Sequence, residues 1–181
     1  QHIGVVTLPD ERLKKLDEIY KPEKVTPATV EFTDIAGLVR GANKGEGLGN
    51  QFLGQIRQVS AIIHVVRCFK DENITHVEGT IDPIRDAELI ETELLLADLE
   101  TINKNIIRLE KLAKKDKDAG RELDILLNLK EHSNEGNMAR TFSVEKDDIN
   151  FIESLFLLTR KPFLYVANVD EKEIMNSKRN E

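Results

Sequence analysis

Asp34 and Gly37 stand at the end of an alternating, β-rich run at 29–34, which predicts a strand. An aspartate at the tip of a strand can hold Mg²⁺ through a water molecule. A glycine close behind it can offer its backbone N–H to a terminal phosphate. Because an Asp-x-x-Gly sequence also arises by chance, this pair indicates a nucleotide site only together with other motifs.

A second polar motif, Asn168-Val169-Asp170-Glu171, follows an apolar run at 162–168. The asparagine amide can donate to one atom of a base and accept from another, and adenine presents that pair at N6 and N7. Open α/β sheets bind ligands at the carboxyl ends of their strands. We therefore expect this motif and Asp34 to serve one nucleotide site.

The connection after the first motif is rich in glycine. Five of the ten glycines of the chain fall within residues 35–49. That density does not suit the interior of a regular helix or strand. We expect a loop that moves and senses the terminal phosphate.

The overall composition limits the class of protein. A length of 181 residues suggests one domain, or one domain with a large insertion, and 40% hydrophobic residues suffice for a core. A net charge of −7 argues against a surface that binds nucleic acid throughout. Cys68 is the single cysteine, which excludes an intramolecular disulfide. No apolar run approaches the roughly 20 residues of a membrane span, so we expect a soluble, cytoplasmic protein.

Hydrophobic patterns along the chain predict alternating helices and strands. The runs at 61–69 and 162–168 are almost wholly apolar, as strands buried on both faces are. Further strands are expected at 3–7 and 29–34, and helices at 11–20 and 50–58. Together these elements indicate an α/β sheet.

Residues 84–159 form a helical segment between the two apolar strands. Within its first helix, 84–115, six apolar residues recur at spacings of 4, 3, 4, 3 and 4, which is the pattern of a coiled-coil seam. They are Leu95, Leu99, Ile102, Ile106, Leu109 and Ala113. Helices at 122–130 and 147–159 would pack back on this seam. We therefore expect a nucleotide-binding domain at 1–83 and 160–181, with a coiled-coil hairpin inserted at 84–159.

Basic residues gather at the expected tip of this insertion. Residues 104–121 hold seven basic and three acidic side chains. The basic residues nearest the tip are Lys111, Lys114, Lys115, Lys117 and Arg121. On an acidic protein, such a cluster at the end of a long arm favours a phosphate-rich partner, and a solvated helix face is the alternative interpretation.

The motifs together resemble switch II of the Obg-related translation-factor ATPases, specifically the YchF or Obg-like ATPase family. The resemblance rests on DIAGLVRGA at 34–42 and KGEGLGNQFL at 44–53. It continues through HVVRCF at 64–69, NITHV at 73–77, DPIRD at 82–86 and residues 92–100. It implies a Ras-like P-loop NTPase fold with a coiled-coil insertion, a C-terminal TGS domain, Mg²⁺-dependent ATP hydrolysis and association with the ribosome or ribosomal RNA.

The same resemblance implies roles for single residues. Leu38 stands where Ras-like enzymes carry a water-orienting glutamine, so the catalytic group comes from elsewhere, and the family places a catalytic histidine at His76. A neutral histidine can orient the attacking water. Guanine-specific enzymes carry an aspartate where this chain has Glu171, which we interpret as loss of guanine selection. Asn168, Val169 and Glu171 would then surround the base of ATP.

The chain also departs from the family pattern, because it contains no G-x-x-x-x-G-K-[S/T] sequence. We expect it to begin after the P-loop, to end before the TGS domain and to be inactive alone. An Obg-type GTPase and a non-catalytic coiled-coil adapter remain the alternatives. No membrane association and no recognition of DNA sequence are expected.

Overall fold

The computed structural model describes residues 2–35, 48–71 and 80–171 of the chain. They belong to two compact units, Gln1–Gly37 and Leu38–Glu181. Within the described residues no helix is both long enough and apolar enough to cross a membrane.

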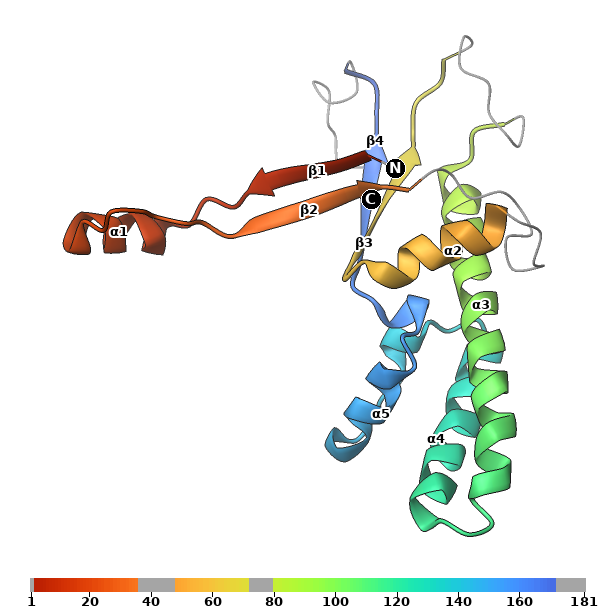
Figure 1. Ribbon diagram of the computed structural model, residues 1–181. Helices are drawn as coiled ribbons and strands as arrows, with labels where there is room; N and C mark the ends of the chain where they lie inside the picture. Colours follow the sequence, from red (N-terminus) through yellow and green to blue (C-terminus); the bar gives the residue numbers. More distant parts are fainter. Residues whose placement is uncertain (1, 36–47, 72–79, 172–181) are drawn as a thin grey trace. The chain divides into compact units, whose positions relative to one another are not determined.

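The first unit is an antiparallel hairpin whose connection contains a helix (Figure 1). Strand β1 (His2–Thr7) pairs with β2 (Thr29–Asp34), so that His2 lies opposite Asp34. Both strands were predicted, and the helix between them, α1 (Glu11–Tyr20), has the predicted bounds.

Helix α1 is delimited by local interactions and not by packing. The Asp10 carboxylate accepts a hydrogen bond from the Arg12 backbone N–H at 2.9 Å, which satisfies one of the free donors of the first turn. At the other end Lys21 takes a left-handed conformation with a φ of 43°. No residue of α1 is buried.

The second unit contains a parallel pair of strands, β3 (Ile62–Arg67) and β4 (Phe163–Asn168). Helix α2 (Leu48–Gln58) precedes β3. Parallel strands need a long crossover, and the helices between β3 and β4 supply it. Both strands and the helix were predicted to within two or three residues at each end.

The prediction that these two strands are buried on both faces is wrong. Side chains alternate between the faces of a strand, and Val66, on the face toward α3, is 7% exposed. On the opposite face Val65 is 59% exposed and Leu164 57% exposed. The reason is that, among the described residues, this sheet has two strands and α3 packs against only one of its faces.

A long helical arm, residues 83–160, extends away from this sheet (Figure 1). It consists of the long helix α3 (Pro83–Leu112), its antiparallel partner α4 (Lys117–Asn134), the short α5 (Ile149–Ser154) and three 3-10 turns. The turns are η2 (Ala139–Thr141), η3 (Lys146–Asp148) and η4 (Leu158–Arg160). Aspartates 82 and 116 cap the two long helices, each accepting from a backbone N–H of the first turn.

The predicted seam of α3 forms the core of the arm. Four of its six residues are buried, and Leu99 and Ala113 are half-buried. Helix α3 contributes Ile102, Ile106 and Leu109 to this core. The residues packed against them come from α4, η2, α5 and the segment between α5 and η4, and they are Ala119, Leu126, Leu129, Ala139, Ile152, Leu155 and Leu157. The helical periodicity of the sequence therefore identified the correct face.

The bounds of the arm helices differ from the prediction. Helix α3 ends at Leu112 because Asp116 starts a new helix, with its carboxylate accepting from the Asp118 N–H at 2.9 Å. Helix α4 begins at Lys117 and ends at Asn134, so it is longer at both ends than the predicted helix at 122–130. The segment 147–159 is not one helix, because α5 ends at Ser154 and Phe156 takes a positive φ of 50°.

Candidate nucleotide site

The carboxyl-terminal edge of the parallel sheet carries the predicted base-binding motif. Asn168 is the last residue of β4 and lies opposite Arg67 of β3. The ladder continues one residue further, since the Cys68 N–H donates to the Asn168 carbonyl oxygen at 2.8 Å. Asn168 and Glu171 are exposed and Val169 is half-buried. Polar groups able to read a base are therefore presented to solvent at the edge where open α/β sheets bind ligands.

Arg67, the last residue of β3, holds the chain segment that follows this strand. Its Nε donates to the Phe69 carbonyl oxygen at 3.1 Å, and one Nη donates to the Asp71 carbonyl oxygen at 3.1 Å. Its guanidinium also lies over the Phe69 ring, 4.8 Å from the centroid. This residue had no assigned role from the sequence. The sequence feature that could have indicated such a role is an arginine at the polar end of an otherwise apolar strand.

The phosphate-side residue Asp34 belongs to a different unit from this edge. Asp34 is exposed at the end of β2 and belongs to the first unit, whereas Asn168 belongs to the second. Gly37 and His76 lie outside the described residues, and so does Leu38. Their predicted roles stay predictions.

Asp34 is suited to a water-mediated role toward a metal. Among the residues that the structure describes, no group of three or more His, Cys, Asp or Glu side chains could by itself enclose a metal ion. Mg²⁺ commonly keeps several waters and takes only one or two carboxylates together with the phosphates of its nucleotide. A single exposed carboxylate at the end of β2 fits that pattern.

An aromatic cluster lies on the α3 side of the sheet. The His64 ring is 5.8 Å from that of Tyr165 and 6.0 Å from that of Phe163, centroid to centroid. Burial lowers the pKa of His64 and so favours its neutral ring, and its Nδ1 is buried without a hydrogen-bond partner among the described residues. The His64 ring is therefore half-buried in aromatic packing against β4.

An ion pair closes the same cluster toward the arm. Arg140 bonds Glu91 of α3 at 2.7 Å, with both side chains largely buried, and its guanidinium lies 5.1 Å from the Phe163 ring centroid. Burial, together with the neighbouring Glu91 carboxylate, raises the pKa of Tyr165 to about 12. The cluster therefore connects β4 to α3, through Glu91, and to η2, through Arg140.

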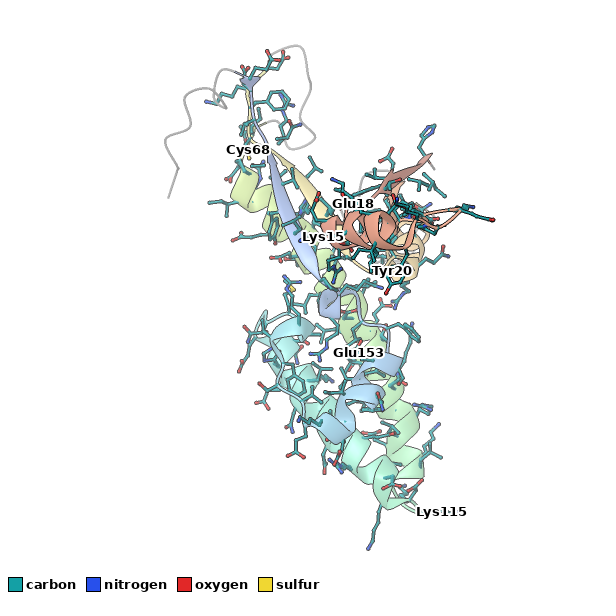
Figure 2. All side chains as sticks on the ribbon, turned by 90° about the vertical axis from the view of Figure 1, so that its left-hand side faces the viewer. Lys15, Glu18, Tyr20, Cys68, Lys115 and Glu153 are labelled. Atoms are coloured by element: carbon teal, nitrogen blue, oxygen red, sulfur yellow. The ribbon has the colours of Figure 1, made fainter. Side chains whose placement is uncertain are left out.

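The basic residues at the tip of the arm fall into two groups. Lys111, Lys114, Lys115 and Lys117 are exposed, and Figure 2 shows Lys115 at the far end of this unit from Cys68. Arg121, in contrast, bonds Asp148 at 2.9 Å and Glu145 at 3.5 Å. Its hydrogen bond to Asp148 raises the pKa of Arg121 and offsets its positive charge. The four lysines are therefore the cations that the described tip exposes to solvent.

Comparison with known proteins identifies relatives of this chain. The family model described as "50S ribosome-binding GTPase" matches residues 14–128. The ribosome-binding ATPase YchF of Bacillus subtilis (strain 168) is 54% identical over 181 residues, covering 99% of this chain and 50% of that protein. The protein of the same name from Escherichia coli O157:H7 is 50% identical over 175 residues, covering 96% of this chain and 48% of that protein.

A solved structure has the same fold. The YchF GTPase of Schizosaccharomyces pombe matches with a TM-score of 0.79 and 39% sequence identity, over 96% of this chain and 48% of that one. The chain thus spans about half the length of the relatives it matches. The predicted α/β, P-loop NTPase fold class is confirmed by this match and by the family model.

Proposed function

This chain belongs to the 50S ribosome-binding GTPase family, in its YchF branch, and from that premise we propose that it is part of a cytoplasmic, ATP-hydrolysing switch protein that acts on the ribosome. The observation that carries the proposal is the exposed Asn168 and Glu171 at the carboxyl end of a parallel strand. The organisation proposed is a nucleotide-binding domain at 1–83 and 160–181 with the helical insertion at 84–159.

Each site residue has a distinct task in this proposal. The Asn168 amide pairs with N6 and N7 of adenine, Val169 packs beside the base, and Glu171 disfavours guanine. Asp34 holds Mg²⁺ through water, and the Gly37 N–H bonds the terminal phosphate. The bound Mg²⁺ neutralises charge on the phosphates during transfer. His76 orients the water that attacks the phosphate.

The preference for adenine is the part of the proposal that most needs a test. The bacterial relatives are named ATPases, whereas the family model and the fission-yeast structure carry the name GTPase. Asn168 alone could serve either base, because an amide can pair with the N7 side of both purines. A YchF-type GTPase is therefore the second candidate, and Glu171 favours the first.

Nucleotide titration of two chains distinguishes these candidates. One is the 181-residue chain, and the other carries a P-loop segment before residue 1. Because the 181 residues contain no P-loop sequence, we expect them to bind fluorescent ATP weakly and to hydrolyse none above background. The extended chain should bind ATP more tightly than GTP, and Asn168→Ala should weaken that binding.

Asn137→Ala, at an exposed asparagine in the arm, is the matched control and should leave ATP affinity unchanged. Equal dissociation constants for ATP and GTP in the extended parent would contradict the adenine assignment. Micromolar ATP affinity of the 181-residue chain would contradict the requirement for a P-loop. Failure of the extended chain to bind either nucleotide would favour the adapter alternative.

A further inference from the structure

Asp98 is a carboxylate buried in α3, away from the sheet edge that carries the base-binding motif. Its side chain is 0% exposed. It accepts hydrogen bonds from the Leu158 N–H, the Thr159 N–H and the Thr159 hydroxyl, each at 2.7 Å. Three donors of this kind satisfy most of the hydrogen-bonding capacity of one carboxylate.

The partners of Asp98 all belong to η4, the last turn before β4. Leu158 and Thr159 begin that turn, and their backbone N–H groups have no acceptor within it. The Thr159 hydroxyl oxygen also accepts from the Ala139 N–H of η2 at 3.0 Å. One carboxylate therefore ties the long helix of the arm to η4 directly, and to η2 through Thr159.

The connection from η4 to β4 consists of Lys161 and Pro162, and each of them is hydrogen-bonded to the segment that leads from α2 into β3. The Lys161 ammonium donates to the carbonyl oxygens of Arg57 and Val59, at 3.2 and 2.5 Å. The Ile62 N–H donates to the Pro162 carbonyl oxygen at 2.9 Å and so starts the β3–β4 ladder. A displacement of η4 therefore shifts the start of β4, and Asn168 is the last residue of that strand.

The charge of Asp98 is costly to bury, and the donors of η4 are what require an acid at this position. Burial raises the pKa of Asp98 more strongly than its three hydrogen bonds lower it, which means that the surroundings disfavour the charge. An apolar side chain would avoid the cost of burying a charge, but it would leave two backbone N–H groups and a hydroxyl without their acceptor, which is itself destabilising. What an apolar side chain cannot do is orient the two N–H groups and the hydroxyl of η4 at once.

We propose that Asp98 is a positioning residue, which sets β4 and the base-binding residues at its end from within the arm. The base-binding role of β4 rests on the proposed function, whereas the positioning of β4 does not. Asp98 and Lys111 lie on the same uninterrupted helix. The hydrogen bonds of Asp98 to η4 therefore also connect the basic tip, through α3, to the strand that ends at the sheet edge.

Hydrogen exchange of the 181-residue chain tests the positioning directly. Asp98→Asn keeps the size of the side chain, but its single amide oxygen leaves either the Leu158 N–H or the Thr159 N–H facing an NH2 group that cannot accept. We expect the amides of η4 and of the β3–β4 ladder to exchange about tenfold faster, as loss of a hydrogen bond to a charged acceptor predicts. The amides of the arm core, around Ile106 and Leu129, should keep the protection of the parent.

Leu126→Ala is the matched control, because Leu126 is 0% exposed in the arm core and takes no part in the hydrogen bonds between Asp98 and η4. It should accelerate exchange in the arm and not selectively in β4. If Asp98→Asn accelerates all amides alike, or gives the pattern of Leu126→Ala, the positioning role is wrong and Asp98 is only part of the core.

A gentler pair of variants keeps the test decisive if Asp98→Asn does not fold. Thr159→Val keeps the shape of the side chain and loses the hydroxyl, whereas Thr159→Ser keeps the hydroxyl. We expect faster exchange in β4 for the first and parental exchange for the second. Identical behaviour of the two variants would overturn the proposal.

The extended chain separates this inference from the proposed function. Asp98→Asn should weaken ATP binding there by about tenfold, with Asn168 still in place. Unchanged ATP affinity would contradict the link between β4 position and base binding. If the extended parent binds no nucleotide, the proposed function fails, and the exchange pattern of β4 still decides the role of Asp98.

Discussion

Tyr165, although 46% exposed, shows how its surroundings in the second unit change the acidity of a single group. Its pKa is raised to about 12 from the ordinary value of 10, mainly by burial and further by the Glu91 carboxylate. Ultraviolet titration in a Tyr20→Phe background should therefore show a phenol that ionises near pH 12. Glu91→Gln should move this ionisation toward the ordinary value, because it removes a negative charge that disfavours the phenolate.

The same pKa shift has a consequence for stability. As the pH rises above 10, the unfolded chain loses the Tyr165 proton before the folded chain does, so stability decreases between about pH 10 and pH 12. Comparing the free energy of unfolding of the parent and of Tyr165→Phe across this range measures that contribution. A difference independent of pH would show that Tyr165 has its ordinary pKa in the folded chain.

His76 is the residue at which the proposed chemistry is most directly tested. In the extended chain, His76→Ala should lower ATP turnover while leaving ATP affinity nearly unchanged, because a water-orienting group acts mainly in the transition state. Loss of such a group commonly lowers turnover on the order of a hundredfold. Single-turnover assays and nucleotide titration separate the two effects. His2→Ala, at an exposed histidine, is the control, and equal turnover in both variants would exclude a catalytic role for His76.

Among the elements, α4 contains a glycine that its structure does not require. Gly120 is the fourth residue of the helix, and a Cβ added there would meet no atom of a neighbouring element within 4 Å. Gly120→Ala should stabilise the chain by about 0.5–1 kcal/mol, because alanine loses less backbone entropy on forming a helix. Thermal or denaturant unfolding followed by circular dichroism measures the change.

Gly136 provides the contrasting case for the same substitution. It follows α4 with a φ of 87°, a conformation that disfavours any side chain, although the space around it is open. Gly136→Ala should therefore destabilise the chain by about 1–2 kcal/mol. If both substitutions shift stability in the same direction, backbone conformation is not what distinguishes the two glycines.

At the scale of the whole molecule, charge is unevenly distributed along an acidic chain. Residues 104–121 carry a net charge of +4, from seven basic and three acidic side chains, against −7 for the whole chain. Changing Lys111, Lys114, Lys115 and Lys117 to Glu should leave folding intact and weaken co-sedimentation with ribosomes. The log of the parent's affinity should fall linearly with the log of the salt concentration, as counterion release requires.

An equal charge reversal elsewhere separates a local contact from net charge. Lys14, Lys15, Lys21 and Lys24 are all exposed in the first unit and provide that control. The control should co-sediment as the parent does. If the tip variant also pellets like the parent at low and at high salt, the lysines only solvate a helix end, and the ribosome contact lies elsewhere.

Local features of the sequence were enough to predict most elements and the seam of the arm. Helical periodicity and β-forming runs are properties of residues that are close in sequence. The aspartates that cap α1, α3 and α4 likewise bond backbone N–H groups only two or three residues away. The errors in the predicted bounds of the helices arise where such a local signal competes with packing. A cap at Asp116 is local, but it competes with continuation of α3, and the hairpin packing of α3 on α4 decides between them.

What the tertiary structure alone decided are contacts between residues far apart in the chain. Asp98 meets Leu158 and Thr159 sixty residues later, and Arg121 meets Asp148 twenty-seven residues later. No spacing rule predicts such pairs, because their geometry depends on how the helices of the arm return to the sheet. The polar motif at Asn168 was visible in the sequence because its chemistry lies in a few adjacent residues. Its position depends on a buried carboxylate whose role becomes visible only when the chain is folded.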